Sequence, residues 1–233
     1  MNPYGKERTI ALYGQEKVDR LSHAHVALFG LGGVGGYALE VLARSGIGEL
    51  TLVDGDVFAP SNLNRQILST QDNVGEKKVD AAALRVQKIF PETIVHTYPL
   101  FVNASSITTL DFSKFDFVLD AIDTISSKVL LAEEALKANV PIISCMGAGN
   151  KNHPEMFRVV DLFETYGDPL SKVMRKLCKE KGIASLPVVF SPEPPLVPAE
   201  QVEGNPRLPA SNAFAPASAG ILLATYAVQK LMK

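Results

Sequence analysis

The stretch LFGLGGVGGYALEVL places Gly30, Gly32 and Gly35 in a G-x-G-x-x-G pattern between an apolar run and a helical one. Glycines allow a tight turn and a close approach of phosphate to backbone N–H groups at a helix N-terminus. Asp54 follows Gly35 by 19 residues, where a carboxylate can accept hydrogen bonds from ribose hydroxyls. A turn whose glycines serve packing alone is the simpler alternative. Because strand, helix and acid occur together, we expect a nucleotide site.

Short apolar runs alternate with helical patterns over the first 150 positions. The runs expected to form strands are residues 25–29, 50–53, 94–98, 115–119 and 141–145. Apolar residues at helical spacing occupy 77–90, between the second and third runs, and 126–139, between the fourth and fifth. Such alternation predicts an α/β fold with a Rossmann-like, doubly wound and mainly parallel sheet.

A different pattern begins after residue 150. Residues 157–164 are typical of a further strand outside the alternation, and residues 167–182 of a helix with Asp168 as its N-cap. Seven prolines between Pro187 and Pro209 predict a loop long enough to be functional, and a final helix is expected from about Pro216 to Met232. We expect residues 1–150 to form the nucleotide-binding portion. Residues 151–233 then form an extension with a substrate region, packed into the same domain.

Composition excludes several classes of protein. Hydrophobic residues make up 46% of the 233 and charged residues 21%, as in ordinary globular proteins, and the net charge of −2 gives no global attraction to nucleic acid. The two cysteines, Cys145 and Cys178, form no C-x-x-C pair, which excludes a four-cysteine zinc site and favours a reducing cytoplasm. We expect neither a signal peptide nor a membrane span, because the N-terminus lacks an apolar core and the apolar C-terminal run is short and interrupted.

The stretch DGDVFAPSNLNRQ, directly after the second expected strand, is rich in polar groups that can handle phosphate. Arg65 can hold a phosphate through its planar guanidinium, and Asn62 can donate to a phosphate oxygen. The carboxyl ends of strands line the ligand crevice of an open α/β sheet, so this loop should face the nucleotide. A surface ion pair of Arg65 with Asp54 or Asp56 is the alternative.

Lys78, Asp120 and Asp123 are expected at the same edge of the sheet. Lys78 opens a helix, where the dipole disfavours a cation unless a polyphosphate lies nearby. Asp123, just past the fourth strand, offers the hard oxygen that Mg2+ prefers. A solvated helix end at Lys77 and Lys78, and a strand-end cap at Asp120, are the alternatives. Together these residues favour a triphosphate and a metal, which NAD does not require.

The motifs GLGGVGG, LVDGD, SNLNRQ, VGEKKVDAA and DAIDT, in this order, resemble the ubiquitin-activating-enzyme-like superfamily of ATP-dependent adenylyltransferases (ThiF/MoeB/HesA). The resemblance implies adenylation of a carboxylate with ATP and Mg2+ by a homodimer, and Arg8 matches the arginine that each subunit inserts into its partner's active site. It implies that the nucleotide is bound by Gly30, Gly32, Gly33, Gly35, Asp54, Asp56, Asn62, Gln66 and Asp120. The implied catalytic residues are Arg65, Lys78, Arg8 and Asp123, the last as the magnesium ligand.

LYGQEKVDRL, MGAGNKNHPEMFRVVDLFET and VVFSPEPP extend the similarity over nearly the whole chain, toward the tRNA threonylcarbamoyladenosine dehydratase branch. This implies ATP-driven cyclisation of that nucleoside in tRNA, without zinc, and leaves a sulfur-transfer partner open. Where some relatives of this branch carry a cysteine, this chain has Val188, so a covalent cysteine mechanism has no obvious residue. Cys145 is expected in the core, and the role of Cys178 is undecided.

Two other functions remain possible from the sequence. One is adenylation of the C-terminus of a small ubiquitin-like sulfur carrier, against which the missing C-x-x-C pairs count, and the other is an NAD-binding oxidoreductase or sensor. A basic helical face is expected to contact tRNA, with a solvated surface as its alternative. Its residues are Lys172, Arg175, Lys176 and Lys179.

Overall fold

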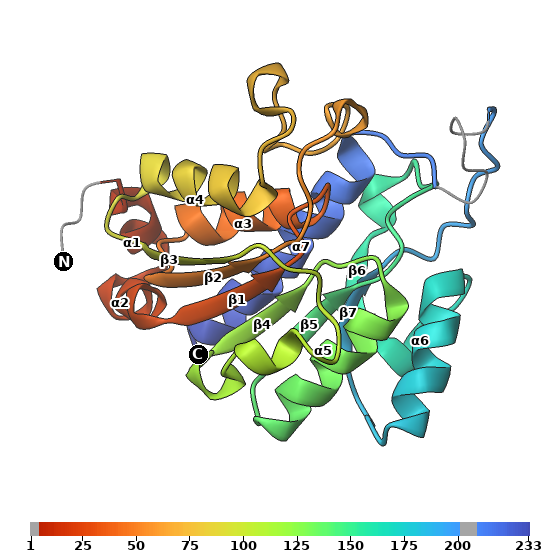
Figure 1. Ribbon diagram of the computed structural model, residues 1–233. Helices are drawn as coiled ribbons and strands as arrows, with labels where there is room; N and C mark the ends of the chain where they lie inside the picture. Colours follow the sequence, from red (N-terminus) through yellow and green to blue (C-terminus); the bar gives the residue numbers. More distant parts are fainter. Residues whose placement is uncertain (1–4, 201–208) are drawn as a thin grey trace.

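The computed structural model describes residues 5–200 and 209–233, which form a single seven-stranded sheet between layers of helices (Figure 1). The strand order is β3-β2-β1-β4-β5-β7-β6. All neighbouring strands are parallel except β6 and β7. The strands are β1 (His25–Phe29), β2 (Glu49–Val53), β3 (Ile94–Tyr98), β4 (Phe117–Asp120), β5 (Ile142–Cys145), β6 (Arg158–Asp161) and β7 (Pro187–Phe190).

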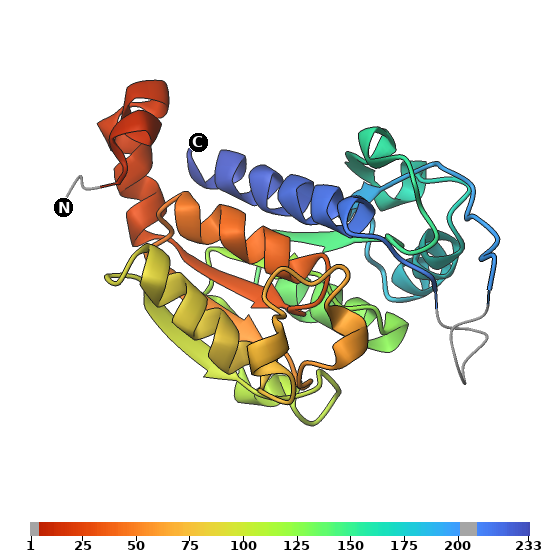
Figure 2. The same ribbon diagram turned by 90° about the horizontal axis from the view of Figure 1, so that it is seen from above.

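The helices divide between the two faces of the sheet. Helices α3, α4 and α7 cover one face, and α5 and α6 lie against the other (Figures 1 and 2). The two short N-terminal helices lead into β1. The bounds are α1 (Glu7–Tyr13), α2 (Gln15–His23), α3 (Gly35–Arg44), α4 (Lys78–Ile89), α5 (Ile125–Lys137), α6 (Pro169–Glu180) and α7 (Phe214–Leu231).

Burial on both faces explains why the central strands are continuous apolar runs. In β1, Val26 and Leu28 belong to the core under α3 and α7, whereas Ala27 and Phe29 belong to the core on the α5 side. The strand order reverses between β1 and β4, whose carboxyl ends therefore flank the position where open α/β sheets bind ligands.

The expected α/β fold is confirmed. Residues 25–29 and 94–98 form β1 and β3 with the expected bounds, and the other three expected strands agree within two residues. The Asp168 carboxylate caps α6 by accepting from the Ser171 N–H at 2.7 Å. Strands β6 and β7 extend the same sheet that β1–β5 form. Within residues 5–200 and 209–233, no helix combines the length and apolar character that crossing a bilayer requires.

The expectation of a loop from residue 187 is wrong for its first four residues, which form β7. Proline is tolerated at the first position of a strand, and the β-branched Val188 and Val189 then pack in the core between β5 and β6. Residues 191–200 have no helix or strand. Residues 201–208 of the expected loop lie outside the described residues.

Candidate active site

The glycine loop between β1 and α3 is a turn that side chains cannot enter. Gly30 has φ +88°, and a Cβ on it would lie 2.7 Å from the Ala121 carbonyl oxygen. A Cβ on Gly35 would lie 1.7 Å from the Gly30 oxygen. The glycines at these two positions are therefore required for the close approach of β1, β4 and the start of α3.

The other two glycines lie against the polar loop that follows β2. A Cβ on Gly32 would lie 3.7 Å from Nε2 of Gln66, and one on Gly33 would lie 3.5 Å from Cγ of Arg65. The structure therefore brings the glycine loop and the residues expected to handle phosphate together, although they are separated by more than thirty positions in the sequence. This juxtaposition leaves backbone at the N-terminus of α3 next to Arg65.

Asp54 ties the end of β2 to the glycine loop. Its Oδ2 accepts from the Leu31 N–H at 2.6 Å, and its Oδ1 accepts from the Asp56 N–H at 2.8 Å. Burial raises the pKa of the Asp54 carboxyl, and the positive charge of Lys78 opposes that shift. The carboxylate therefore fixes the turn at the end of β2.

The loop between β2 and α4 is organised by its own side chains. The Asn62 Oδ1 accepts from the Ala59 N–H at 3.0 Å, which caps a short 3-10 turn over Pro60–Asn62. Gln66 is buried, and its Oε1 has no hydrogen-bond partner among the residues that the structure describes. A buried amide oxygen beside a glycine loop is a polar group that a ligand can satisfy.

Arg65 and Lys78 present cations at this edge. The half-buried Arg65 donates from Nη1 to the Ser61 carbonyl at 2.7 Å and to Asn64 Oδ1 at 2.8 Å, so the alternative pairing with Asp54 or Asp56 is not formed. Lys78 is 5% exposed, and its Nζ lies 3.0 Å from Asp56 Oδ2. Lys78 is therefore not part of a solvated helix end, which was the alternative interpretation.

The two acids after β4 differ in their surroundings. Asp120 is fully buried, pairs with the equally buried Lys128 at 2.8 Å and accepts from the Ser144 hydroxyl at 2.5 Å. Its contacts are those of a strand-end cap. Asp123 is exposed, and its Oδ1 accepts from the Thr124 hydroxyl at 3.3 Å.

Lys128 was missed from the sequence although it neutralises Asp120 directly below the site. Its Nζ also donates to the Ile122 carbonyl at 2.9 Å, which holds the segment between β4 and α5. The available signal was its position in α5, because Lys128 falls on the same helical stripe as the buried Leu131 and Ala135. A lysine on an apolar stripe must either reach solvent or meet an acid.

Arg8 lies near the amino ends of the strands, whereas this site lies at their carboxyl ends. It is exposed on α1, and the preceding Lys6 contacts Gly46 and Phe90, which come before the amino ends of β2 and β3. Its own glycine loop lies beyond the carboxyl end of β1. Arg8 therefore does not belong to the active site of its own subunit.

The basic face of α6 divides into two kinds of residue. Lys172, Lys176 and Lys179 are exposed, although Lys176 pairs with Glu180 at 3.9 Å. Arg175 is half-buried and donates to the Thr165 carbonyl at 2.8 Å, which anchors α6 to the turn before it. The exposed lysines can meet a polyanion, and Arg175 has a structural task.

A comparison with protein families completes the description of the site. Residues 4–233 match the model of the ThiF family. The chain belongs to the ThiF family. It is 38% identical over 232 residues to a tRNA threonylcarbamoyladenosine dehydratase of Bacillus subtilis, covering 94% of this chain and 91% of the relative.

Solved structures give the same relationship. The crystal structure of the Escherichia coli tRNA N6-threonylcarbamoyladenosine dehydratase with AMP superposes with a TM-score of 0.91 at 31% identity, covering 99% of this chain and 94% of that one. The same enzyme with ATP gives 0.88. By contrast, the adenylyltransferase and sulfurtransferase UBA4 of Vanderwaltozyma polyspora matches 62% of this chain and 32% of its own length, at 36% identity. The resemblance to the dehydratase branch is confirmed.

Proposed function

We propose that this ThiF-family chain is an ATP-dependent dehydratase that activates the carboxylate of threonylcarbamoyladenosine in tRNA by adenylation and promotes its cyclisation. The observation that carries the proposal is the near full-length similarity to dehydratases, one of which has been solved with AMP and with ATP. The glycine loop beside Arg65, Gln66 and Asp54 supports it, because these groups suit a ribose and phosphates.

The chemistry follows from the charge of the substrate. A carboxylate is a poor electrophile, and its attack on the α-phosphorus of ATP forms an acyl-adenylate and releases pyrophosphate. The ureido group of the same nucleoside side chain then attacks the acyl carbon, and AMP leaves as the ring closes. Attack by a tethered group can be worth about 7–11 kcal/mol of barrier. The protein must then mainly stabilise charge on the phosphates, for which we propose Arg65 and Lys78.

Magnesium fits the residues at this edge. The exposed oxygens of Asp123, held by one hydroxyl contact, form a hard donor that suits Mg2+. We propose Asp123 as its protein ligand, with the substrate phosphates supplying others. Bound Mg2+ would screen the negative charge of the phosphates. The buried and neutralised Asp120 suits that task less well and supports the loop from below.

The chain organisation that we propose follows the chemistry. Residues 1–150 would hold ATP, and residues 151–233, which include the exposed lysines of α6, would face the tRNA in the cytoplasm. The alternative, activation of a sulfur-carrier protein, gains less support from relatives that cover only part of the chain. We favour no sulfur-transfer partner.

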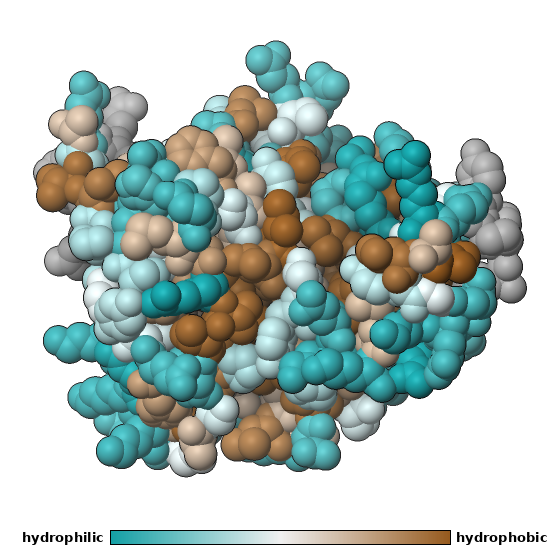
Figure 3. All heavy atoms as spheres, turned by 180° about the vertical axis from the view of Figure 1, so that it is seen from behind, coloured by the Kyte–Doolittle hydropathy of each residue, from teal (hydrophilic) through white to brown (hydrophobic). Residues whose placement is uncertain are grey.

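A homodimer is part of the proposal. Arg8 lies on α1, away from the glycine loop of its own chain, and apolar side chains remain exposed on α1 (Leu12, 72%) and on α7 (Phe214, 45%; Ile221, 46%). Figure 3 shows hydrophobic residues gathered at the centre of the face that α7 crosses. An apolar pocket of about 500 Å3 lies near the C-terminal end of α7, lined in part by Leu136, Ile183 and Tyr226. Surfaces of this kind mark protein contacts.

The decisive experiment is incubation with ATP, Mg2+ and tRNA carrying threonylcarbamoyladenosine, followed by mass analysis of the nucleosides. Loss of one water from the modified nucleoside, dependent on ATP, is the expected result. A matched reaction with NAD in place of ATP should leave the nucleoside unchanged. An unchanged mass with protein that binds ATP, together with adenylation of a carrier protein, would instead support the alternative.

A further inference from the structure

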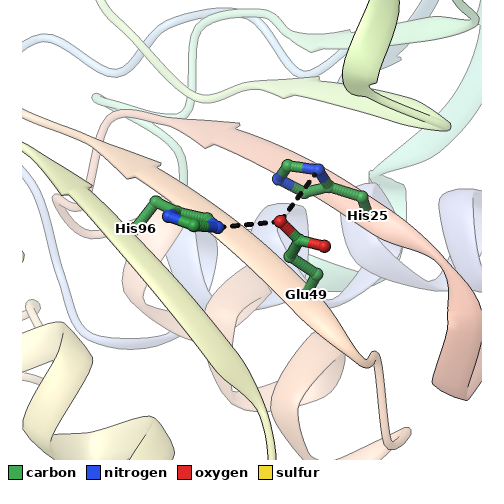
Figure 4. Close-up of side chains that lie close together, drawn as sticks. All are labelled: His25, Glu49 and His96. Carbon is green, nitrogen blue, oxygen red and sulfur yellow. Dashed lines mark hydrogen bonds and ion pairs between the residues drawn. The ribbon is translucent and has the colours of Figure 1, made fainter.

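Two histidines and a glutamate meet on one face of the sheet, at the end away from the nucleotide site. His25 opens β1, Glu49 opens the neighbouring β2, and His96 lies in the middle of β3. His25 is in register with Glu49, and Thr51 with His96, so all four side chains project from the same face. Figure 4 shows the two imidazoles on either side of the carboxylate.

The three side chains already converge on one point. The Glu49 Oε1 lies 2.7 Å from Nε2 of His96 and 3.4 Å from Nδ1 of His25. One potential ligand atom from each residue lies within 4.8 Å of the others. Ligands of a tetrahedral Zn2+, at bonds of 2.0–2.1 Å, stand about 3.4 Å apart. Small side-chain rotations would therefore admit an ion between them.

The outer partners of His25 fit a metal ligand. Its Nε2 lies 2.8 Å from the hydroxyl of the buried Thr51, so the ring is held with Nδ1 toward Glu49. Metal-binding histidines generally hydrogen-bond through their other ring nitrogen in this way. The edge of the Phe115 ring packs against the imidazole at a centroid distance of 5.1 Å and fixes it from another side.

Charge and access select the kind of ion. Two neutral imidazoles and one carboxylate supply a net charge of −1 and a mixed nitrogen and oxygen donor set, which favours Zn2+ over Mg2+. The His96 and Glu49 side chains are 44% and 34% exposed, so an ion can enter from solvent and keep a water as its fourth ligand. Among residues 5–200 and 209–233, no other group of three histidines, cysteines or acids shares this spacing.

We propose that His25, Glu49 and His96 form a Zn2+-binding site that joins β1, β2 and β3. Strand β1 separates it from the glycine loop by about 13 Å, at roughly 3.3 Å per residue, so it is distinct from the proposed magnesium site. The absence of C-x-x-C pairs does not bear on a site of this composition. An ion that binds only the folded chain stabilises it by mass action.

Calorimetric titration of the EDTA-treated full chain with ZnCl2, without nucleotide, tests the site. We expect one Zn2+ per chain, with affinity falling more than tenfold in His96→Ala and in Glu49→Gln. Thr51→Val should weaken binding less. His153→Ala is the matched control, because that exposed histidine also lies beside a glutamate, Glu155 at 2.9 Å, yet has no third ligand in the described part of the chain. Its affinity should equal that of the unchanged chain.

A second measurement separates this site from adventitious binding. Co2+ bound by two imidazoles and a carboxylate should give the visible absorption of a four- or five-coordinate ion, and His96→Ala should lose it. Circular dichroism verifies folding, and His96→Gln serves as a second variant. Failure to bind Zn2+, or equal affinity in His96→Ala and His153→Ala, would overturn the proposal. Neither outcome depends on ATP or tRNA, so it leaves the proposed function untouched.

Discussion

Arg65 carries the sharpest test at the scale of single residues. Within residues 5–200 and 209–233, its guanidinium hydrogen-bonds to the Ser61 carbonyl and the Asn64 side chain of its own loop, and both can bond to water instead. Arg65→Ala should therefore leave the melting temperature nearly unchanged, while activation falls by ~10²-fold or more because a phosphate loses its charged donor. ATP–pyrophosphate exchange with modified tRNA measures this.

Arg20→Ala is the matched control for that experiment. Arg20 is an exposed arginine on α2 that pairs with Glu16 at 2.7 Å, and removing it should leave exchange at the level of the unchanged chain. If Arg65→Ala kept more than a third of the exchange rate, Arg65 would not be a catalytic residue.

The cysteines bear on whether an acyl group passes through the protein. Both are fully or almost fully buried, and burial raises the pKa of Cys145 to about 12 and that of Cys178 to about 11. A raised thiol pKa means that the thiolate, the reactive form, becomes common only near those pH values. At pH 8 iodoacetamide should therefore label the native chain far more slowly than the chain unfolded in guanidinium.

Replacing both cysteines tests directly whether either thiol carries an acyl group. The double variant Cys145→Ala and Cys178→Ala should retain cyclisation, with any loss explained by its lower stability. A thioester trapped on Cys178, or loss of turnover in a variant that still folds and binds ATP, would refute a mechanism without a protein acyl intermediate.

Single residues also mark a limit of sequence reasoning. The glycines, Asp54 and Arg65 could be predicted to approach one another because their roles follow from local motifs and strand order. The pairing of Lys128 with Asp120 could not, since it depends on how α5 settles against β4. The contacts of Lys128 and Asp120 nevertheless hold the segment between β4 and α5, which is part of the DAIDT motif.

Helix α6 is the element on which the proposed contact with tRNA depends. Its exposed Lys172 and Lys179 have no structural task in the described contacts, whereas Arg175 anchors the helix. Lys172→Gln with Lys179→Gln should weaken tRNA binding and lower the slope of log K against log salt by roughly 1–2, while ATP affinity stays the same. Filter binding across a salt series measures it.

The control for this test is Lys88→Gln, an exposed lysine on α4 that the proposal places away from tRNA. If the slope of log K for tRNA binding against log salt were equal in the α6 variant and this control, the helix face would be a solvated surface that does not contact tRNA. Replacing Arg175 instead would confuse the result, because loss of its bond to Thr165 would also loosen α6.

Strands could be predicted where the local sequence sets their limits, and could not where pairing with neighbouring strands sets them. Runs such as HVALF and IVHTY are bounded by turn residues, and their limits were found. Strand β7 was hidden because Pro187 begins a segment rich in proline, and only pairing with β5 and β6 reveals it. Residues 25, 49 and 96 could not be associated from the sequence either, because the register of three strands brings them together.

At the scale of the whole molecule, the glycine loop lies at the carboxyl ends of the strands and Arg8 lies near their amino ends. One subunit therefore cannot complete the implied site, and a symmetric dimer can, since each subunit would donate an arginine to its partner. Equilibrium sedimentation should find a dimer, and an exposed change such as Ile221→Glu on α7 should shift it toward monomer.

Mixing two inactive variants tests the shared site directly. Arg8→Ala and Arg65→Ala should each lose cyclisation. After co-expression with two different affinity tags, the purified heterodimer contains one site with both arginines intact and one with neither. It should recover about half of the activity of the dimer without substitutions, as expected for one working site of two. If Arg8 acted within its own subunit, each site of the heterodimer would lack one arginine, and activity would not return.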